Sequence, residues 1–210
     1  MSFDKRLINY WDEYYKKEHV PSFPSPFVKY VANQLIPELD ILEIGCGNGR
    51  DSKFLSSKGH NVTGLDRSSK AIELCINLYP DESIEFVCGT ISGLVLKKFD
   101  LIYSRFVMHA MSLDEEIETL KMCYGLLKED GKLFIECRSI KDPLSCKGES
   151  LSHTEKIDGH YRRFIILEEF TQRLAETGFE VIKTIENKGL AKFGEEDPVI
   201  IRVKAIKKSS

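Results

Sequence analysis

The most informative residues of this chain are the glycines at positions 45, 47 and 49, which follow an apolar run at 40–44. The run has the pattern of a short buried strand, and the segment after the glycines has the pattern of a helix. A strand, a glycine turn and a helix bring bare backbone and a helix N-terminus close to a nucleotide-like ligand. Glycine suits such a turn because a Cβ would obstruct the ligand and because a positive φ can be required.

The details of the turn distinguish between two kinds of ligand. A dinucleotide fingerprint has a third glycine in the spacing G-x-G-x-x-G, and this chain has Arg50 at that position. An acidic residue, Glu43, lies in the strand just before the turn. A carboxylate there would repel a pyrophosphate and suits a ligand with a positively charged end. The alternative is an ordinary glycine-rich turn that binds nothing.

Residues 43–49, EIGCGNG, resemble the first motif of the class I S-adenosylmethionine-dependent methyltransferases. The resemblance covers about residues 38–206, and the segment 126–133 is similar to the one that leads into the fifth strand of that family. It implies an α/β fold, a Rossmann-like three-layer sandwich with a seven-stranded, mostly parallel sheet and an antiparallel last strand. The implied organisation is a helical lid or cap at 1–37 and a methyltransferase domain at 38–206, with a substrate-side insertion at about 139–165.

The pattern of the whole chain agrees with this fold. Apolar runs and helical patterns alternate through its middle, which indicates parallel βαβ units. Turns are expected at 129–131 and, with solvated carboxylates, at 194–198. The expected strands are 40–44, 61–65, 84–87, 99–103, 132–137, 179–185 and 198–205, and the expected helices are 70–78, 113–127 and 167–177, the last ending at Gly178 as a C-cap.

Asp66 ends the second expected strand, about 20 residues after the glycine turn, where an acid can accept hydrogen bonds from both ribose hydroxyls. A helix N-cap is a second interpretation, and the two are compatible. By the resemblance, Asp66 binds the ribose, and Thr90, where the family more often has Asp, lies beside the adenine. The residues implied for S-adenosylmethionine are Glu43, Gly45, Cys46, Gly47, Gly49, Asp66, Arg67, Thr90, Ile91, Ser104 and Tyr14.

Aromatic residues gather at positions 10–15, before a proline-rich segment at 21–26 that ends the helical pattern. Rings beside a sulfonium give cation–π attraction and exclude water. In similar enzymes such a segment folds over the cofactor. The alternative is a helix packed on the sheet, with the rings in the core. The site candidates in this segment are Tyr10, Trp11, Tyr14 and Phe23.

Substrate-binding groups are expected where the strands end. His109 follows the fourth strand and is the candidate base, because imidazole titrates near neutrality; packing or capping is the alternative. Arg162 and Arg163 lie in the insertion and could hold a phosphate or carboxylate through paired hydrogen bonds, or be solvated charges of an edge hairpin. The substrate candidates are Arg105, Arg138, His160, Tyr161 and Arg163.

Composition limits the function classes. The chain has 210 residues, which suits one domain, and a net charge of −3, which disfavours a large nucleic-acid face. The six cysteines contain no C-x-x-C pair, so reduced thiols are expected and no metal site. No apolar stretch approaches the ~20 residues of a membrane span, and the N-terminus lacks the apolar core of a signal peptide. A cytoplasmic protein with no membrane partner is expected.

The sequence therefore predicts an S-adenosylmethionine-dependent methyltransferase with a small anionic acceptor, phosphorylated, nucleotide-linked or carboxylated, glycan precursors included. The sequence D/N-P-P-Y, which marks amino-group methyltransferases of nucleic acids and protein amides, does not follow the fourth strand. Two alternatives remain: a tRNA or protein acceptor, and a non-catalytic sensor or partner subunit that binds S-adenosylmethionine.

Overall fold

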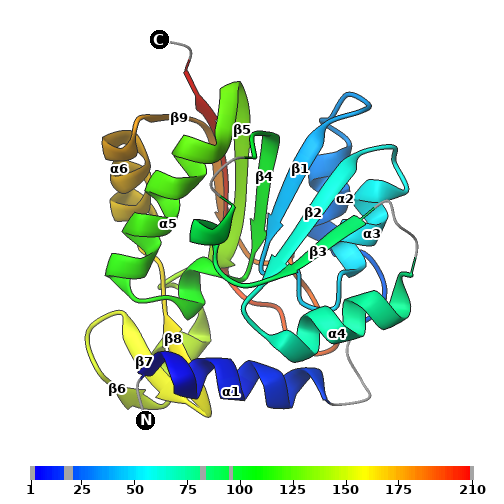
Figure 1. The fold of residues 1–210 in the computed structure, drawn as a ribbon. Helices are drawn as coiled ribbons and strands as arrows, with labels where there is room; N and C mark the ends of the chain where they lie inside the picture. Colours follow the sequence, from blue (N-terminus) through cyan, green and yellow to red (C-terminus); the bar gives the residue numbers. More distant parts are fainter. Residues whose placement is uncertain (1–2, 17–20, 81–83, 95–96, 209–210) are drawn as a thin grey trace.

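The computed structural model of the chain describes residues 3–16, 21–80, 84–94 and 97–208 (Figure 1). Five strands pair in parallel, and β10 is antiparallel to both of its neighbours. The seven-stranded, Rossmann-like fold with an antiparallel last strand is therefore confirmed. The order across the sheet is β3 (Ile84–Cys88), β2 (Asn61–Asp66), β1 (Asp40–Ile44), β4 (Phe99–Arg105), β5 (Leu127–Arg138), β10 (Ile200–Lys207) and β9 (Phe179–Asn187).

The central strands are apolar on both faces because helices cover both faces. In β4, Leu101 and Tyr103 pack toward Phe27, whereas Ile102 packs toward Leu120 on the opposite face. Figure 1 shows the resulting layers, with α5 and α6 together on one side of the sheet. The covering helices are α2 (Pro26–Ala32), α3 (Arg50–Ser56) and α4 (Ser69–Leu78) on one face, and α5 (Leu113–Leu126) and α6 (Leu167–Thr177) on the other.

Local signals explain most of the boundaries. Ser112 and Glu115 form a capping box that starts α5. Gly178 ends α6 with a φ of 105°, as the sequence predicted. The predicted turn at 129–131 is instead an irregularity within β5. There the pairing partners of Phe99 and Leu101 are Leu127 and Lys132, so extra residues bulge out of the strand.

The insertion at 139–165 forms a small sheet of its own. Its antiparallel strands are β6 (Glu149–Ser150), β7 (Glu155–Asp158) and β8 (His160–Arg163), preceded by the short helix η3 (Pro143–Cys146). Two further short helices, η1 (Ile91–Gly93) and η2 (Met108–Ala110), follow β3 and β4. Strand β8 contacts η2, so the insertion reaches back to the end of the main sheet.

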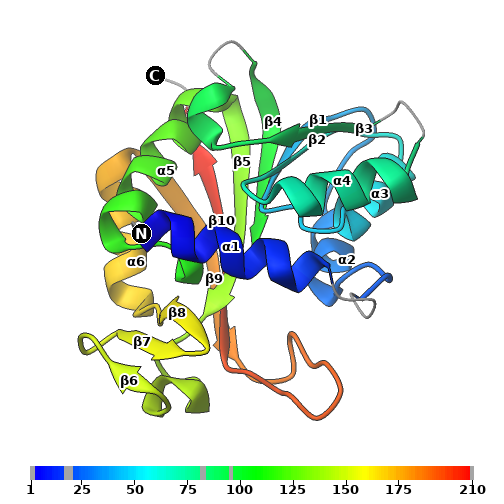
Figure 2. The same ribbon diagram turned by 60° about the horizontal axis from the view of Figure 1, so that its bottom comes forward.

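Helix α1 (Phe3–Tyr15) crosses the end of the main sheet, between β8 and α4 (Figure 2). Asp12 anchors it, because the Ser68 hydroxyl at the start of α4 donates a hydrogen bond of 2.6 Å to the Asp12 carboxylate. Helix α2 has a different role, since Phe27, Val28 and Val31 are buried in the core. Among the described residues of the predicted cap at 1–37, α1 covers the end of the sheet, whereas α2 packs into the core.

The described ranges contain no helix that is both long and apolar enough to cross a membrane. All six cysteines are free thiols. Among the described side chains, no group of three His, Cys, Asp or Glu residues could hold a metal ion.

Candidate active site

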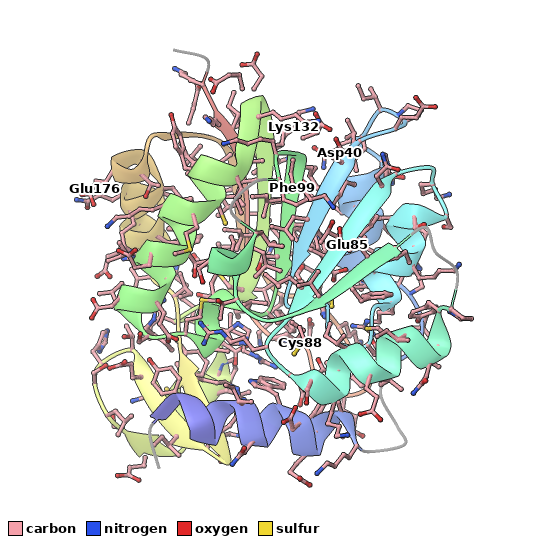
Figure 3. The ribbon with its side chains drawn as sticks, viewed as in Figure 1. Asp40, Glu85, Cys88, Phe99, Lys132 and Glu176 are labelled. Carbon is pink, nitrogen blue, oxygen red and sulfur yellow. The ribbon has the colours of Figure 1, made fainter. Side chains whose placement is uncertain are left out.

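A cavity of about 410 Å³ lies between α1 and the C-terminal ends of the parallel strands. Figure 3 shows this end of the sheet, where Cys88, the last residue of β3, lies toward α1, whereas Asp40 at the start of β1 lies at the far end. Open α/β sheets bind ligands at this edge. Each of the five parallel strands brings a predicted site residue to the cavity, namely Glu43, Asp66, Thr90, Arg105 and Arg138.

The glycine turn between β1 and α3 forms one wall of the cavity. The backbone N–H groups of Gly45 and Cys46 donate hydrogen bonds of 2.7 and 3.0 Å to the Leu65 carbonyl, which fix the turn against β2. A Cβ at Gly45 (φ 71°) would lie 2.2 Å from Val107 Cγ2, and one at Gly47 (φ 56°) 2.3 Å from the Tyr15 hydroxyl. Close approach and positive φ therefore both require glycine.

The acidic end of the cavity begins at Glu43. Its carboxylate is buried and accepts a hydrogen bond from the Ser52 hydroxyl. Burial, together with the neighbouring Asp51 carboxylate, raises the pKa of Glu43 well above its usual value. Asp51 also lines the cavity, and it accepts hydrogen bonds from the Ser25 backbone N–H (2.7 Å), the Ser25 hydroxyl (2.6 Å) and the Tyr103 hydroxyl (2.7 Å). These contacts tie residue 25 to the glycine turn.

Asp66 faces the glycine turn. Its carboxylate accepts hydrogen bonds of 2.9 Å from the backbone N–H groups of Gly47 and Ser68, and burial raises its pKa. The cap of α4 is Ser68, whose hydroxyl accepts a hydrogen bond from the Ala71 N–H, so the N-cap interpretation of Asp66 is wrong. Asp66 also lines the cavity, so its role in ribose binding stays a prediction.

The aromatic residues of α1 close the cavity from the side opposite the sheet. Tyr10, Trp11 and Tyr14 line it, as does Tyr15. Tyr10 stacks on His160 of β8, with ring centroids 4.3 Å apart. Phe23, predicted with them, is 63% exposed and lies outside the lining.

The basic end of the cavity holds Arg105, Arg138 and Arg162, here called the arginine cluster. Arg105 donates a hydrogen bond of 2.9 Å from Nε to buried Glu136, which Arg202 also contacts (2.7 Å). Arg138 pairs with two carboxylates, Asp142 (3.1 Å) and Glu196 (3.3 Å).

Arg162 differs from the other two arginines of the cluster. It is half-buried, and its guanidinium has no ion pair or hydrogen bond with any residue that the structure describes. The Asp158 and Glu196 carboxylates interact with it only electrostatically, without a hydrogen bond. Its N–H groups are therefore available to a ligand.

His109 lines the cavity beside this cluster. Burial, with Arg138 and Arg162 nearby, lowers the pKa of His109 well below its usual value, so the ring is neutral at pH 7. The Arg138 backbone N–H donates to His109 Nδ1 at 3.3 Å. A neutral ring that accepts at Nδ1 carries its proton on Nε2. His109 can therefore donate a hydrogen bond, which argues against the predicted role of a general base.

Phe106, which the sequence analysis missed, lies between these groups. The Arg105 guanidinium stacks on its ring at 4.2 Å, and the His109 ring contacts its edge at 5.3 Å. Its φ is 61°, a conformation that costs free energy for a residue with a Cβ and that is frequent at functional sites. Nothing in the sequence signals this backbone.

Four other predicted site residues lie outside the cavity lining. The Arg163 guanidinium is buried against Glu116 and donates to the Met111 carbonyl (3.1 Å), while the Tyr161 hydroxyl donates to Glu155 (2.6 Å). Neighbouring residues of a strand point to opposite faces, so His160 and Arg162 of β8 reach the cavity, whereas Tyr161 and Arg163 do not. The remaining two, Gly49 and Ser104, lie behind the lining.

Arg163→Ala is expected to lower the free energy of unfolding by about 3 kcal/mol, because the buried carboxylate of Glu116 loses one of its ion-pair partners. Arg173 still contacts Glu116 in this variant, which places the effect at the low end of the range for buried pairs. Thermal or urea unfolding measures it. The matched control is Arg162→Ala, which removes the adjacent, unpaired guanidinium, and equal destabilisation by both variants would contradict the assignment.

Comparison with known proteins also indicates a similarity to methyltransferases. A family model described as a methyltransferase domain matches residues 42–135, which hold the glycine turn, Asp66, Thr90 and the end of β4. Over these residues the chain is similar to methyltransferases. The cofactor predicted from the sequence, S-adenosylmethionine, agrees with this similarity.

Individual curated relatives differ widely from this chain. A ubiquinone biosynthesis O-methyltransferase from Actinobacillus pleuropneumoniae is 27% identical over 145 residues, which are 63% of this chain and 60% of the relative. Two further curated relatives are matched over 52% and 47% of their own length, so the likeness spans about half of these proteins.

Two solved structures show how far the fold is shared. An S-adenosylmethionine-dependent methyltransferase from Methanosarcina mazei has a TM-score of 0.72 at 19% identity, over 86% of this chain and 98% of that one. The [4+2]-cyclase SpnF also has a TM-score of 0.72, at 15% identity, over 87% of this chain and 81% of that one. Because a cyclase shares the fold, the activity has to be argued from the site.

Proposed function

We propose that this protein transfers the methyl group of S-adenosylmethionine to a small anionic acceptor. The observation that carries the proposal is the division of one cavity into an acidic end at the glycine turn and a basic end at the arginine cluster. The order of the strands produces this division, because β2 and β1 carry Asp66 and Glu43, and β4 and β5 carry Arg105 and Arg138.

The acidic end fits the cofactor. The glycines at 45 and 47 allow Val107 and Tyr15 to lie directly against the backbone of the turn, and the Glu43 carboxylate suits a positively charged group. Asp66 can accept hydrogen bonds from ribose hydroxyls, and Thr90 and Ile91 line the cavity beyond it, where an adenine would lie. When bound, S-adenosylmethionine supplies a methyl group on a positively charged sulfur. The protein's task is then to orient the acceptor and to exclude water.

The basic end fits an anionic acceptor next to the cofactor. Val107, in the loop after β4, contacts Gly45, so the arginine cluster begins directly beside the glycine turn. The four aromatic rings of α1 line the cavity opposite the sheet, where they would limit the access of water to a bound cofactor. A covered cavity of about 410 Å³ suits a small molecule better than a tRNA or protein acceptor.

Calorimetric titration is expected to show micromolar binding of S-adenosylhomocysteine and no comparable binding of NAD. The physical reason is that the Glu43 and Asp51 carboxylates line the glycine turn, where a pyrophosphate would have to lie. A clear NAD isotherm, with no heat from either S-adenosylmethionine or S-adenosylhomocysteine, would contradict the proposed cofactor.

The activity itself is tested with S-adenosylmethionine that carries an isotopic methyl group and a panel of carboxylated and phosphorylated metabolites, each paired with its neutral amide or dephosphorylated form. Label is expected in anionic members of the panel only. Cofactor binding without label transfer to any member would favour the sensor or partner-subunit alternative.

A further inference from the structure

Among the residues that the structure describes, the basic end of the cavity holds cations and neutral imidazoles but no unpaired carboxylate. His160 lines it with His109, and burial, with Arg162 and Arg138 nearby, lowers the pKa of His160 to about 4. Both rings are therefore neutral at pH 7 and are weak proton acceptors. The titratable groups that face His109 come from several elements around it: the cations Arg105 from β4, Arg138 from β5 and Arg162 from β8, and the neutral His160, also from β8.

The carboxylates of the cavity are engaged elsewhere. Asp51 and Asp66 accept the hydrogen bonds described above at the glycine-turn end, and Glu43 lies at that end with Ser52. Glu196, the carboxylate of the basic end, is paired with Arg138 and mostly exposed. Tyr10 and Tyr15 keep their protons because burial raises the pKa of each.

We propose that the acceptor presents an ionised oxygen, from a carboxylic acid or an acidic hydroxyl, and that the arginine cluster binds this anion so that no side-chain base is used. The proposal rests on the methyl transfer proposed above and names the nucleophile. The acceptor oxygen forms its bond to the methyl carbon while the carbon–sulfur bond breaks, and the electron pair of that bond goes to sulfur. No proton leaves, so the lack of a base is consistent with the chemistry.

Each of the donor groups at the basic end of the cavity has a role in binding the anion. Arg162 offers N–H groups that no described residue occupies, and Arg105 is held by Glu136, so its guanidinium is fixed across the Phe106 ring. Two guanidinium groups with Nε2–H of His109 make a set of donors only. Such a set stabilises an anion over its conjugate acid, which lowers the pKa of a bound hydroxyl by about 1–3 units.

The test uses 4-nitrophenol as a probe of the S-adenosylhomocysteine complex, because its phenolate is coloured and its protonation is read from absorbance without turnover. The pKa of the bound probe is expected to fall by about 1–3 units. Arg162→Ala is expected to lose most of this shift. Lys156 on β7 is the strand-pairing neighbour of Arg162, and Lys156→Ala, which removes its charge, is expected to retain the pKa shift of the probe.

Two further measurements complete the test. Nitrogen-15 spectra of the imidazoles are expected to show His109 neutral, with its proton on Nε2, before and after the probe binds. Benzoate is expected to displace the probe and benzamide is not, and the relative affinities of benzoate and nitrophenolate separate a carboxylic acid from an acidic hydroxyl as the preferred source of the anion.

The proposal is overturned if the bound probe keeps or raises its pKa, if its proton moves to His109, or if neither nitrophenolate nor benzoate binds at millimolar concentration. Formation of the S-adenosylhomocysteine complex is checked first by calorimetry. Failure at that step contradicts the proposed function, whereas failure with the probe in a verified complex contradicts only the ionised nucleophile.

Discussion

Asp66→Ala is expected to weaken the binding of S-adenosylhomocysteine by about 100-fold or more while the protein remains folded. Hydrogen bonds to a charged group contribute about 1.5–3 kcal/mol each, and a tenfold change in affinity corresponds to about 1.4 kcal/mol. Two such bonds to ribose hydroxyls would be lost. Calorimetry measures the affinity, and thermal unfolding checks the fold.

A control is needed because Asp66 also accepts backbone N–H groups from Gly47 and Ser68, so its removal disturbs the glycine turn as well. Comparing S-adenosylhomocysteine with its 2′-deoxy analogue separates the two effects. Loss of the ligand hydroxyl should weaken binding to the wild type and should have little further effect in Asp66→Ala. Asp114→Ala, an exposed aspartate of α5, should change neither affinity. Independent losses in protein and ligand would make Asp66 a support of the turn only.

The cofactor half of the cavity could be predicted because its signals are local. The glycines at 45 and 47 follow the apolar strand directly, and Asp66 ends the next strand along the chain, so spacing alone indicated that they meet. The central parallel strands β1 and β4 are buried on both faces and appear as apolar runs, which explains why they were also predicted.

The acceptor half could be predicted only in part, because its residues meet through long-range packing. Successive side chains of β8 point to opposite faces, so Arg162 reaches the cavity and Arg163 does not. This alternation predicts which arginine reaches the cavity only once β8 is known to be a strand. Glu196 was expected in a solvated turn, but it pairs with Arg138, 58 residues away. His109 was identified by its residue type, while the hydrogen bond that sets its tautomer depends on where β5 ends.

Arg162→Ala is expected to lower kcat/KM for the best anionic acceptor of the panel by about 10–100-fold, since one charge-assisted hydrogen bond contributes about 1.5–3 kcal/mol. The affinity for S-adenosylhomocysteine should be unchanged, because Asp66 and Glu43 lie at the other end of the cavity. Initial rates of label transfer at limiting acceptor measure the effect.

Two companion variants decide whether Arg162 binds the acceptor through its guanidinium or acts only by its charge. Arg162→Lys keeps the charge but loses the planar pair of donors, so partial recovery is expected for a carboxylate acceptor. Lys156→Ala removes a neighbouring charge outside the cavity lining and should leave the rate unchanged. If Lys156→Ala lowered the rate as much as Arg162→Ala, the acceptor would be responding to the general field of the small sheet. If Arg162→Ala instead weakened S-adenosylhomocysteine binding, the basic end would belong to the cofactor, and the acceptor would have to approach from another side of α1.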